Sequence, residues 1–461
     1  MNKTSFPNNF FWGAATSSHQ IEGGQHNDWT EWEQANADRL AAEAPKQFQT
    51  TVPRWEEIKH EATHPANYIS GTCDDSYTRY AEDVQLVKSL GLNAYRFSLE
   101  WSRFEPTEGA WEQATVDHYR AVLNELKANN IEPWVTLWHR SLPVWTDEQG
   151  GWENKKTISD YARFVEKVVN EFKNTVQFWM PLNEPEFEVI GGYLGGKYPP
   201  QKKNLFAANR AFNNLAEAHR QAFTIIHRLR PDAMVGIPHA ALAVDGYKNK
   251  FLNRKLAQLI SYFTNWRYLN AVQHHTDFIG VQYYTRGTIN LTLKLKTQNS
   301  AGFPFVEQVN MGFPKSDMGM EIDAKGITPY LEECWKRYKK PIVITENGVA
   351  DRNDTYRGQF ITDILAEVAQ AMQSGIDVRG YFHWSLLDNF EWDKGFWPRF
   401  GLATVDRTTQ KRTLRPSAQI YANIIKNSKI DWQTKVPSLH CILEYANKLL
   451  SSYYSCSYVH A

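Results

Sequence analysis

The stretch Pro341-Ile342-Val343-Ile344-Thr345-Glu346-Asn347-Gly348 decides the fold that we expect for this chain. Its run of apolar and β-branched residues predicts a buried strand, and Asn347-Gly348 predicts a turn directly after it. Glu346 then stands at the exposed end of a buried strand, where its carboxylate faces a cleft. Taken alone, the stretch also fits a carboxylate that only decorates a turn between a strand and a loop.

A second stretch with the same pattern favours the interpretation that Glu346 faces a cleft. Phe178-Trp179-Met180-Pro181-Leu182-Asn183-Glu184-Pro185 is again an apolar run that ends in a carboxylate and is stopped by proline. Hydrolysis of a glycosidic bond requires two such carboxyl groups, one ionised and one holding a proton. Leu182-Asn183-Glu184-Pro185 and Ile344-Thr345-Glu346-Asn347-Gly348 resemble the two signatures of glycoside hydrolase family 1, the β-glucosidase family, and the resemblance covers residues from about 6 to 428.

Short apolar runs that end in polar residues alternate with amphipathic stretches, the pattern of repeated βα units around a parallel sheet. The eight strands that we expect are Phe11–Ser17, Ala94–Leu99, Glu132–Trp138, Phe178–Leu182, Met234–Pro238, Phe278–Tyr284, Ile342–Thr345 and Gly380–Trp384. Helical spacing is clearest over Tyr77–Leu90 and Ile158–Phe172. A doubly wound dinucleotide-binding sheet is the alternative, but no Gly-x-Gly-x-x-Gly follows the first run.

We therefore predict an α/β protein, a single (β/α)8 TIM barrel with long βα loops over residues 1–430. In such a barrel the site lies at the carboxyl ends of the strands, where Glu184 ends the fourth strand and Glu346 the seventh. A long polar insertion, Trp29–Cys73, is expected to shape the mouth of the site. Residues 431–461 form a C-terminal extension, for which a packing helix, a contact between copies and a segment foreign to the fold all remain open.

The composition limits the partners of the chain. Its 51 basic and 51 acidic residues give a net charge of zero without a basic run, so we expect no nucleic acid or membrane partner and an uncharged small-molecule substrate, a β-glycoside. The 17 tryptophans exceed what a core needs, and indole faces suit sugar rings. Four scattered cysteines without zinc spacing, and an N-terminus without the apolar region of a signal peptide, predict a cytoplasmic protein. Assembly into homo-oligomers is left open.

The resemblance implies roles for four residues. Glu346 corresponds to the nucleophile and Glu184 to the general acid that later acts as base. The family supplies an arginine and a tyrosine that keep the nucleophile ionised, and this chain has Arg96 and Tyr284 at those places. An arginine within an apolar strand is seldom an ordinary surface ion pair. The mechanism that the resemblance implies needs no metal and no cofactor.

A sugar-binding subsite is implied in the same way. It comprises Gln20, His139, Asn183, Trp384, Glu391 and Trp392. Amide, imidazole and carboxylate groups hydrogen-bond sugar hydroxyls, while Trp384 offers a face to the ring. His139 alone fits a core histidine equally well, and its position at a strand end favours a substrate contact. Branches of the family that cleave phosphorylated glycosides usually lack the Glu391-Trp392 pair.

Three positions depart from the family pattern. Gln282 replaces the usual asparagine, and Arg140 follows His139 where an aromatic residue is usual. For Arg140 two interpretations are open, binding of an acidic group and pairing with a neighbouring carboxylate, and we favour pairing. Met320 replaces a tryptophan that serves as a platform for the aglycone, so we expect weaker stacking there.

The sequence thus predicts a hydrolase, a retaining exo-β-glycosidase and most specifically a β-glucosidase, with β-galactosidase or β-fucosidase side activity. A sugar-binding barrel without turnover is the alternative outside catalysis, but such a barrel has no use for both Glu184 and Glu346. The alternative among catalytic functions is transglycosylation by the same residues.

Overall fold

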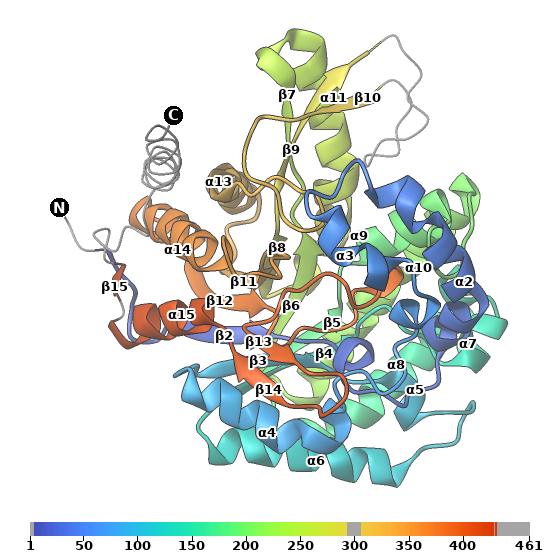
Figure 1. The fold of residues 1–461 in the computed structure, drawn as a ribbon. Helices are drawn as coiled ribbons and strands as arrows, with labels where there is room; N and C mark the ends of the chain where they lie inside the picture. The colour runs from blue at the N-terminus through green and yellow to red at the C-terminus, as the bar shows by residue number, and fades with distance from the viewer. Residues whose placement is uncertain (1–3, 293–305, 428, 431–461) are drawn as a thin grey trace, which may run out of the picture.

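A computed structural model describes residues 4–292, 306–427 and 429–430. Eight parallel strands close into a barrel in the order β11-β12-β2-β3-β4-β5-β6-β8, and helices surround it (Figure 1). The barrel strands are β2 (Phe11–Ala15), β3 (Ala94–Ser98), β4 (Glu132–Trp138), β5 (Phe178–Leu182), β6 (Met234–Ala240), β8 (Phe278–Tyr283), β11 (Ile342–Asn347) and β12 (Val378–Trp384). The predicted barrel is confirmed.

The eight predicted strands all lie in the barrel, and the errors are at their ends. β4 and β5 have the predicted bounds, whereas β2 ends before Ser17 because this residue precedes a short helix, α1 (Ser18–Ile21). The turn predicted at Asn347-Gly348 was placed one residue too early. Asn347 still belongs to β11, where it pairs with Tyr283 of β8 and His383 of β12.

The outer layer consists of helices that bury one face against the barrel. Its longer members are α4 (Ser76–Ser89), α6 (Gln113–Ala128), α8 (Lys156–Phe172), α10 (Leu205–Leu229), α13 (Ile327–Tyr338), α14 (Arg357–Gln373) and α15 (Pro416–Asn427), and shorter ones are α5 (Trp101–Phe104), α7 (Val144–Glu148), α9 (Pro185–Phe187) and α12 (Arg267–Val272). In α8 the buried Tyr161, Phe164, Val165, Val168 and Phe172 recur every three to four residues. Each such side chain contributes about 1.5 to 3 kcal/mol when buried, which holds the helix to the sheet.

The insertion after the first strand is largely helical. It contains α2 (Asp28–Phe48), α3 (Trp55–Ala62) and the 3-10 helix η1 (Pro65–Tyr68). Asn27 caps α2, because its side chain accepts from the backbone of Thr30 at 3.0 Å and the Thr30 hydroxyl accepts from the backbone of Asn27 at 2.9 Å. Trp29 and Trp32 of α2 pack in one apolar cluster with Trp392. The insertion therefore supports a predicted site residue from behind.

A small sheet stands at the carboxyl ends of β6 and β8. It comprises β7 (Ala243–Gly246), β9 (Arg286–Leu291) and β10 (Val306–Val309), in the order β10-β9-β7. Helix α11 (Phe251–Ser261) packs on it through Ala257 and Ile260, which contact Ile289 and Val306. The sheet and α11 project from one side of the barrel at the top of Figure 1. Two further strand pairs, β13 (Ala403–Val405) with β14 (Arg412–Leu414) and β1 (Thr4–Ser5) with β15 (Lys429–Ile430), lie outside the barrel.

Aromatic side chains fill the barrel interior toward the amino ends of the strands. The rings of Trp134 and Phe178 stack with 4.0 Å between their centroids, and Phe278 and Phe382 meet Trp134 at steeper angles. Below them a hollow of about 640 Å³ is lined by Trp134, Phe178 and Phe278 together with Phe11 and neighbouring residues. The amino end of the barrel is thus apolar, and polar side chains gather at the other end.

Cys73 and Cys334 are buried free thiols, whereas Cys441, Cys456 and the extension 431–461 lie outside the described residues. Within residues 4–292, 306–427 and 429–430, no three His, Cys, Asp or Glu side chains gather as a metal site would require. None of the helices described in these ranges is long and apolar enough to cross a membrane.

Candidate active site

Glu346 is held by two donors near the carboxyl end of β11. Its Oε1 accepts a hydrogen bond from Arg96 Nη1, and its Oε2 accepts one from the Tyr284 hydroxyl at 2.6 Å. Arg96 is fully buried in β3 and reaches Glu346 across the barrel interior. A guanidinium and a hydroxyl directed at one carboxylate stabilise its ionised form. The structure thus brings together three of the four residues predicted to carry the chemistry.

Asn183 links the two catalytic candidates. Its Oδ1 accepts from Arg96 Nη2 at 2.6 Å and from Gln282 Nε2 at 2.8 Å, while its amide nitrogen lies 3.1 Å from His139 Nε2. Because the amide nitrogen can only donate, Nε2 of His139 accepts and Nδ1 carries the proton. The same arginine therefore contacts Glu346 and the neighbour of Glu184.

Glu184 follows β5 in a left-handed backbone conformation, with φ of 43°, and its amide donates to the Pro238 carbonyl at 3.0 Å. The side chain is buried, and this burial raises the pKa of Glu184 to about 7. The negative charge of Glu346 acts in the same direction, whereas Arg140 favours the ionised form of Glu184. One glutamate is thus surrounded by donors while the other retains a proton to near neutral pH.

The other predicted sugar contacts lie around this pair. Trp384 at the end of β12 faces the His139 ring with 6.1 Å between centroids, and Gln20 donates to the Phe390 carbonyl at 2.8 Å. Burial raises the pKa of Glu391 to about 7. Glu391 Oε2 and His139 Nδ1 have no hydrogen-bond partner among the described residues. A buried acceptor and a buried donor without partners are what a site for hydroxyl groups requires.

Comparison with known proteins agrees with this geometry. The profile of glycosyl hydrolase family 1 matches residues 2–273 and 262–430. The chain belongs to glycosyl hydrolase family 1. It is therefore a β-glucosidase-type glycoside hydrolase that acts on O-glycosyl bonds.

Individual members of family 1 match the chain over nearly its whole length. Beta-glucosidase A of Thermotoga maritima is 29% identical over 472 residues, which cover 94% of this chain and 100% of that protein. A solved structure of the family 1 β-glucosidase from Thermotoga maritima has a TM-score of 0.80 at 28% identity, covering 93% of this chain and 100% of that one. The β-glycosidase from Pyrococcus horikoshii has a TM-score of 0.81 at 33% identity, covering 95% and 100%.

Arg140, where family 1 usually has an aromatic residue, pairs with a carboxylate as we favoured. The carboxylate is Glu184 itself, whose Oε2 accepts from Arg140 Nη2 at 3.0 Å. The guanidinium carbon lies 5.3 Å from the ring centroid of Trp392 and 5.4 Å from that of Tyr198. These rings hold the guanidinium against Glu184. Burial disfavours the charge of Arg140, but Tyr198, Glu184 and Glu188 together outweigh it and raise the pKa of Arg140 above its usual value.

The other two positions that depart from the family 1 pattern are Gln282 and Met320. Gln282 points its amide at Asn183 and so reaches the hydrogen-bond centre of the site. Met320 is partly exposed, and its backbone is hydrogen-bonded to Ser316, with the Met320 amide donating to Ser316 Oγ at 3.3 Å. Its role at the aglycone stays a prediction.

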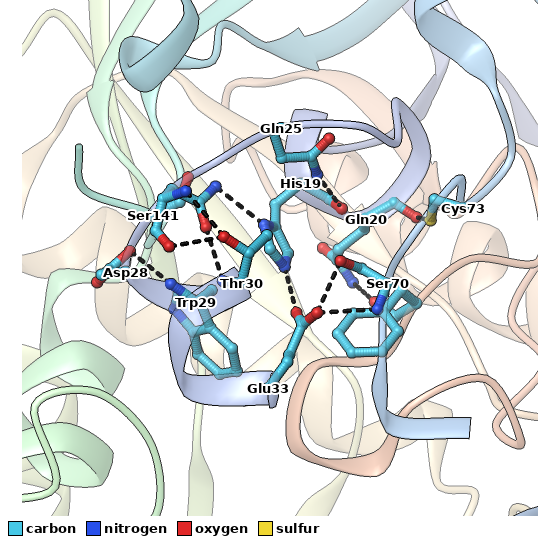
Figure 2. A network of polar contacts seen from close by, with 12 residues as sticks. His19, Gln20, Gln25, Asp28, Trp29, Thr30, Glu33, Ser70, Cys73 and Ser141 are labelled. Carbon is cyan, nitrogen blue, oxygen red and sulfur yellow. Dashed lines mark hydrogen bonds and ion pairs between the residues drawn. The ribbon is translucent and has the colours of Figure 1, made fainter. Parts of the chain in front are cut away.

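A buried polar network behind the site was not predicted. His19 Nε2 lies 2.7 Å from Glu33 Oε1, and the other Glu33 oxygen accepts from the backbone and hydroxyl of Ser70 at 2.8 and 2.7 Å (Figure 2). The Asn27 amide donates to His19 Nδ1 at 3.1 Å. The fixed His19 ring stacks on Trp392 at 5.3 Å and an angle of 5°. His19 stands beside Gln20 in the sequence, but Glu33 lies in the insertion, where spacing gave no signal.

The same network holds the loop that carries Arg140. The Ser141 hydroxyl lies within hydrogen-bond distance of both Glu100 oxygens, 3.2 and 2.9 Å away, and Asn27 donates to Glu100 at 3.2 Å. Arg140 has a left-handed φ of 70°, which is uncommon for a residue with a side chain. The contacts of Ser141 with Glu100 stabilise this conformation and thereby direct the guanidinium toward Glu184.

Proposed function

We propose that the chain is a retaining exo-β-glycosidase, a β-glucosidase that releases terminal β-D-glucosyl residues from the non-reducing end of its substrates. The observation that carries the proposal is the contrast between the two carboxyl groups. Glu346 receives hydrogen bonds from Arg96 and Tyr284, whereas burial and the nearby charge of Glu346 raise the pKa of Glu184 to about 7. Glycoside hydrolysis by two carboxyl groups needs one ionised and one protonated group, and in the retaining mechanism that we propose the ionised one, Glu346, is the nucleophile.

In the first step Glu346 attacks the anomeric carbon while Glu184 donates its proton to the leaving oxygen. The glycosidic bond breaks, the aglycone leaves as an alcohol, and a glycosyl ester forms on Glu346. The ester neutralises Glu346, so the pKa of Glu184 falls and its carboxylate takes a proton from water. As that water attacks the anomeric carbon, the ester bond to Glu346 breaks, so the sugar leaves with its original configuration, Glu346 is again a carboxylate and Glu184 is again protonated.

The sugar subsite supports an uncharged glycone. Glu391 Oε2 accepts from one sugar hydroxyl and His139 Nδ1 donates to another, since both atoms are buried and unpartnered in the described part of the chain. Burial lowers the pKa of His139, so its ring is neutral and adds no charge. Trp384 covers a face of the pyranose ring.

Azide rescue tests the two roles separately. Glu346→Gly should abolish turnover of nitrophenyl β-glucoside, and azide should restore it with an α-glucosyl azide as product, because the anion attacks from the emptied face. In Glu184→Ala the ester still forms with an activated leaving group, so azide should give the β-anomer. The same anomer from both variants would mean that the roles are wrongly assigned. Sugar binding by the wild type with no turnover of any nitrophenyl glycoside would favour the non-catalytic alternative.

A further inference from the structure

The exposed large apolar side chains of this protein are concentrated in one part of the chain. Of the twelve found among the described residues, eleven lie between Leu194 and Phe313. Five of these belong to one helical run, formed by α11 and the π-helix η5 (Tyr262–Trp266) that continues it. Exposed apolar residues scattered singly are ordinary, but a group of them on one helix indicates an interaction surface.

The five side chains share the outer face of this helical run. Phe251, Leu252, Leu259, Tyr262 and Phe263 are 61, 62, 54, 45 and 51% exposed. At about 100° per residue they fall within an arc of about 120°. The opposite face carries the residues buried against the small sheet. A surface helix normally exposes polar residues to solvent. This helix exposes apolar residues instead, as a helix does when another surface covers it.

Basic side chains accompany the apolar ones. From Gly246 to Thr276 the chain has five lysines and arginines and no aspartate or glutamate. Four of the five, Lys248, Lys250, Arg254 and Lys255, are exposed. None of these four takes part in an ion pair formed by the described residues, and the charged groups of Arg254 and Lys255 each lie 5.8 Å from the Phe251 ring centroid. The zero net charge of the whole chain, from which we expected no membrane partner, conceals this local excess.

We propose that this surface, the outward side chains of residues 248–263, docks on an anionic lipid surface. A helix with exposed aromatic and leucine residues next to lysines and arginines lies in the membrane interface, where the apolar groups enter the acyl boundary and the cations meet lipid phosphates. A second copy of the chain fits less well. A symmetric dimer through this face would bring Lys250 and Lys255 of one copy toward the same charges of the other.

The docking surface lies at the active end of the barrel. β7, which precedes α11, follows the carboxyl end of β6, and β9, which adjoins β7, follows that of β8. Glu184 and Glu346 lie at the same ends of their strands. A docked molecule would therefore hold its active end, and not the hollow, toward the lipid.

Vesicle co-sedimentation of the full-length protein tests the proposal. The wild type should sediment with vesicles of mixed phosphatidylglycerol and phosphatidylcholine, and less of it should bind at high salt. It should bind little to vesicles of pure phosphatidylcholine. A basic residue near an anionic surface contributes about 1 kcal/mol, which is about fivefold in the partition coefficient. Lys250→Glu with Lys255→Glu should therefore weaken binding at least about 20-fold. Phe251→Ser with Leu252→Ser should also weaken it, through the apolar contact alone.

The matched control changes charge elsewhere by the same amount. Lys46→Glu with Lys336→Glu alters two exposed lysines outside this surface and should change the partition by less than about twofold. Retained activity on nitrophenyl β-glucoside shows that each variant is folded. An equal loss in the control, or no binding to anionic vesicles by the wild type, would overturn the proposal. A dimer in sedimentation velocity that Phe251→Ser with Leu252→Ser converts to monomer, without effect on vesicle binding, would make the surface a subunit interface instead.

Discussion

Replacing Arg140 by methionine should make Glu184 a weaker acid. The substitution keeps an unbranched apolar stem near Trp392 and Tyr198 but removes the guanidinium that lies 3.0 Å from Glu184 Oε2. Because Arg140 stabilises the ionised form of Glu184, its loss should raise the pKa of Glu184 above about 7. The protonated acid, and with it the first chemical step, should then persist to higher pH.

The expected size follows from the contact. With about 4 Å between the charge centres and an effective dielectric constant of about 20, the interaction is worth about 4 kcal/mol. This corresponds to about three pKa units. Water that enters the vacated space stabilises the carboxylate, so we expect a smaller rise, of about one to two units.

The assay is the pH profile of kcat/KM with nitrophenyl β-glucoside, whose alkaline limb reports the acid of the free enzyme. In Arg140→Met this limb should move to higher pH by about one to two units, whereas Arg140→Lys, which keeps the charge, should move it by less than half as much. An alkaline limb that stays in place, or moves to lower pH, in Arg140→Met would refute the reasoning. If Glu184→Gln still showed the limb of the wild type, the limb would belong to another group.

Three further predictions concern the rim and the stability of the site. Met320→Trp should lower KM for cellobiose several-fold and leave nitrophenyl β-glucoside nearly unchanged, because an aromatic platform adds about 0.5 to 1.5 kcal/mol for the second sugar; equal shifts in steady-state assays of both substrates would place Met320 outside the acceptor site. Above about pH 7, where Glu391 is ionised, its charge should repel a phosphate group, so glucoside 6-phosphates should be hydrolysed there at least about tenfold more slowly than the neutral sugars, and equal rates would contradict an uncharged glycone. Between about pH 4.5 and 7 the folded chain keeps a proton on Glu391 that the unfolded chain releases, so stability falls as pH rises through this range. Glu391→Gln should therefore reduce the fall in Tm between about pH 5 and 8 seen in thermal scans, and an unchanged fall would assign it to other buried carboxyl groups.

The barrel could be predicted because each of its strands has its own local sequence signal. A buried parallel strand is a short apolar run, and a carboxylate directly after it must lie at the carboxyl edge, which suffices to place Glu184 and Glu346 at one end of the barrel. Arg96 could be placed for the same reason, since an arginine inside such a run has to find a buried partner.

Contacts between side chains from separate segments could not be predicted. Nothing in the sequence says that Arg140 meets Glu184, because that contact depends on the left-handed backbone at Arg140 and on the bonds of Ser141. The sequence shows Glu33 only as one residue of a polar insertion. Its burial could not be predicted, because the burial of one carboxylate on a helix depends on how the helix packs. The exposed apolar face of α11 could not be predicted either. Spacing identifies the apolar residues of a helix, but it does not show which of them the tertiary structure leaves exposed to solvent.

The single amide of Asn183 has a consequence for how this enzyme can change. It joins Arg96, Gln282 and His139, so its donors and acceptors are shared between the nucleophile side and the sugar side of the site. A substitution at any of these positions alters the others, and its effect on turnover depends on which residues are already present. We therefore expect strong epistasis here: the effect of a substitution at 282 on specificity in laboratory evolution should depend on which residue stands at 183, and the reverse.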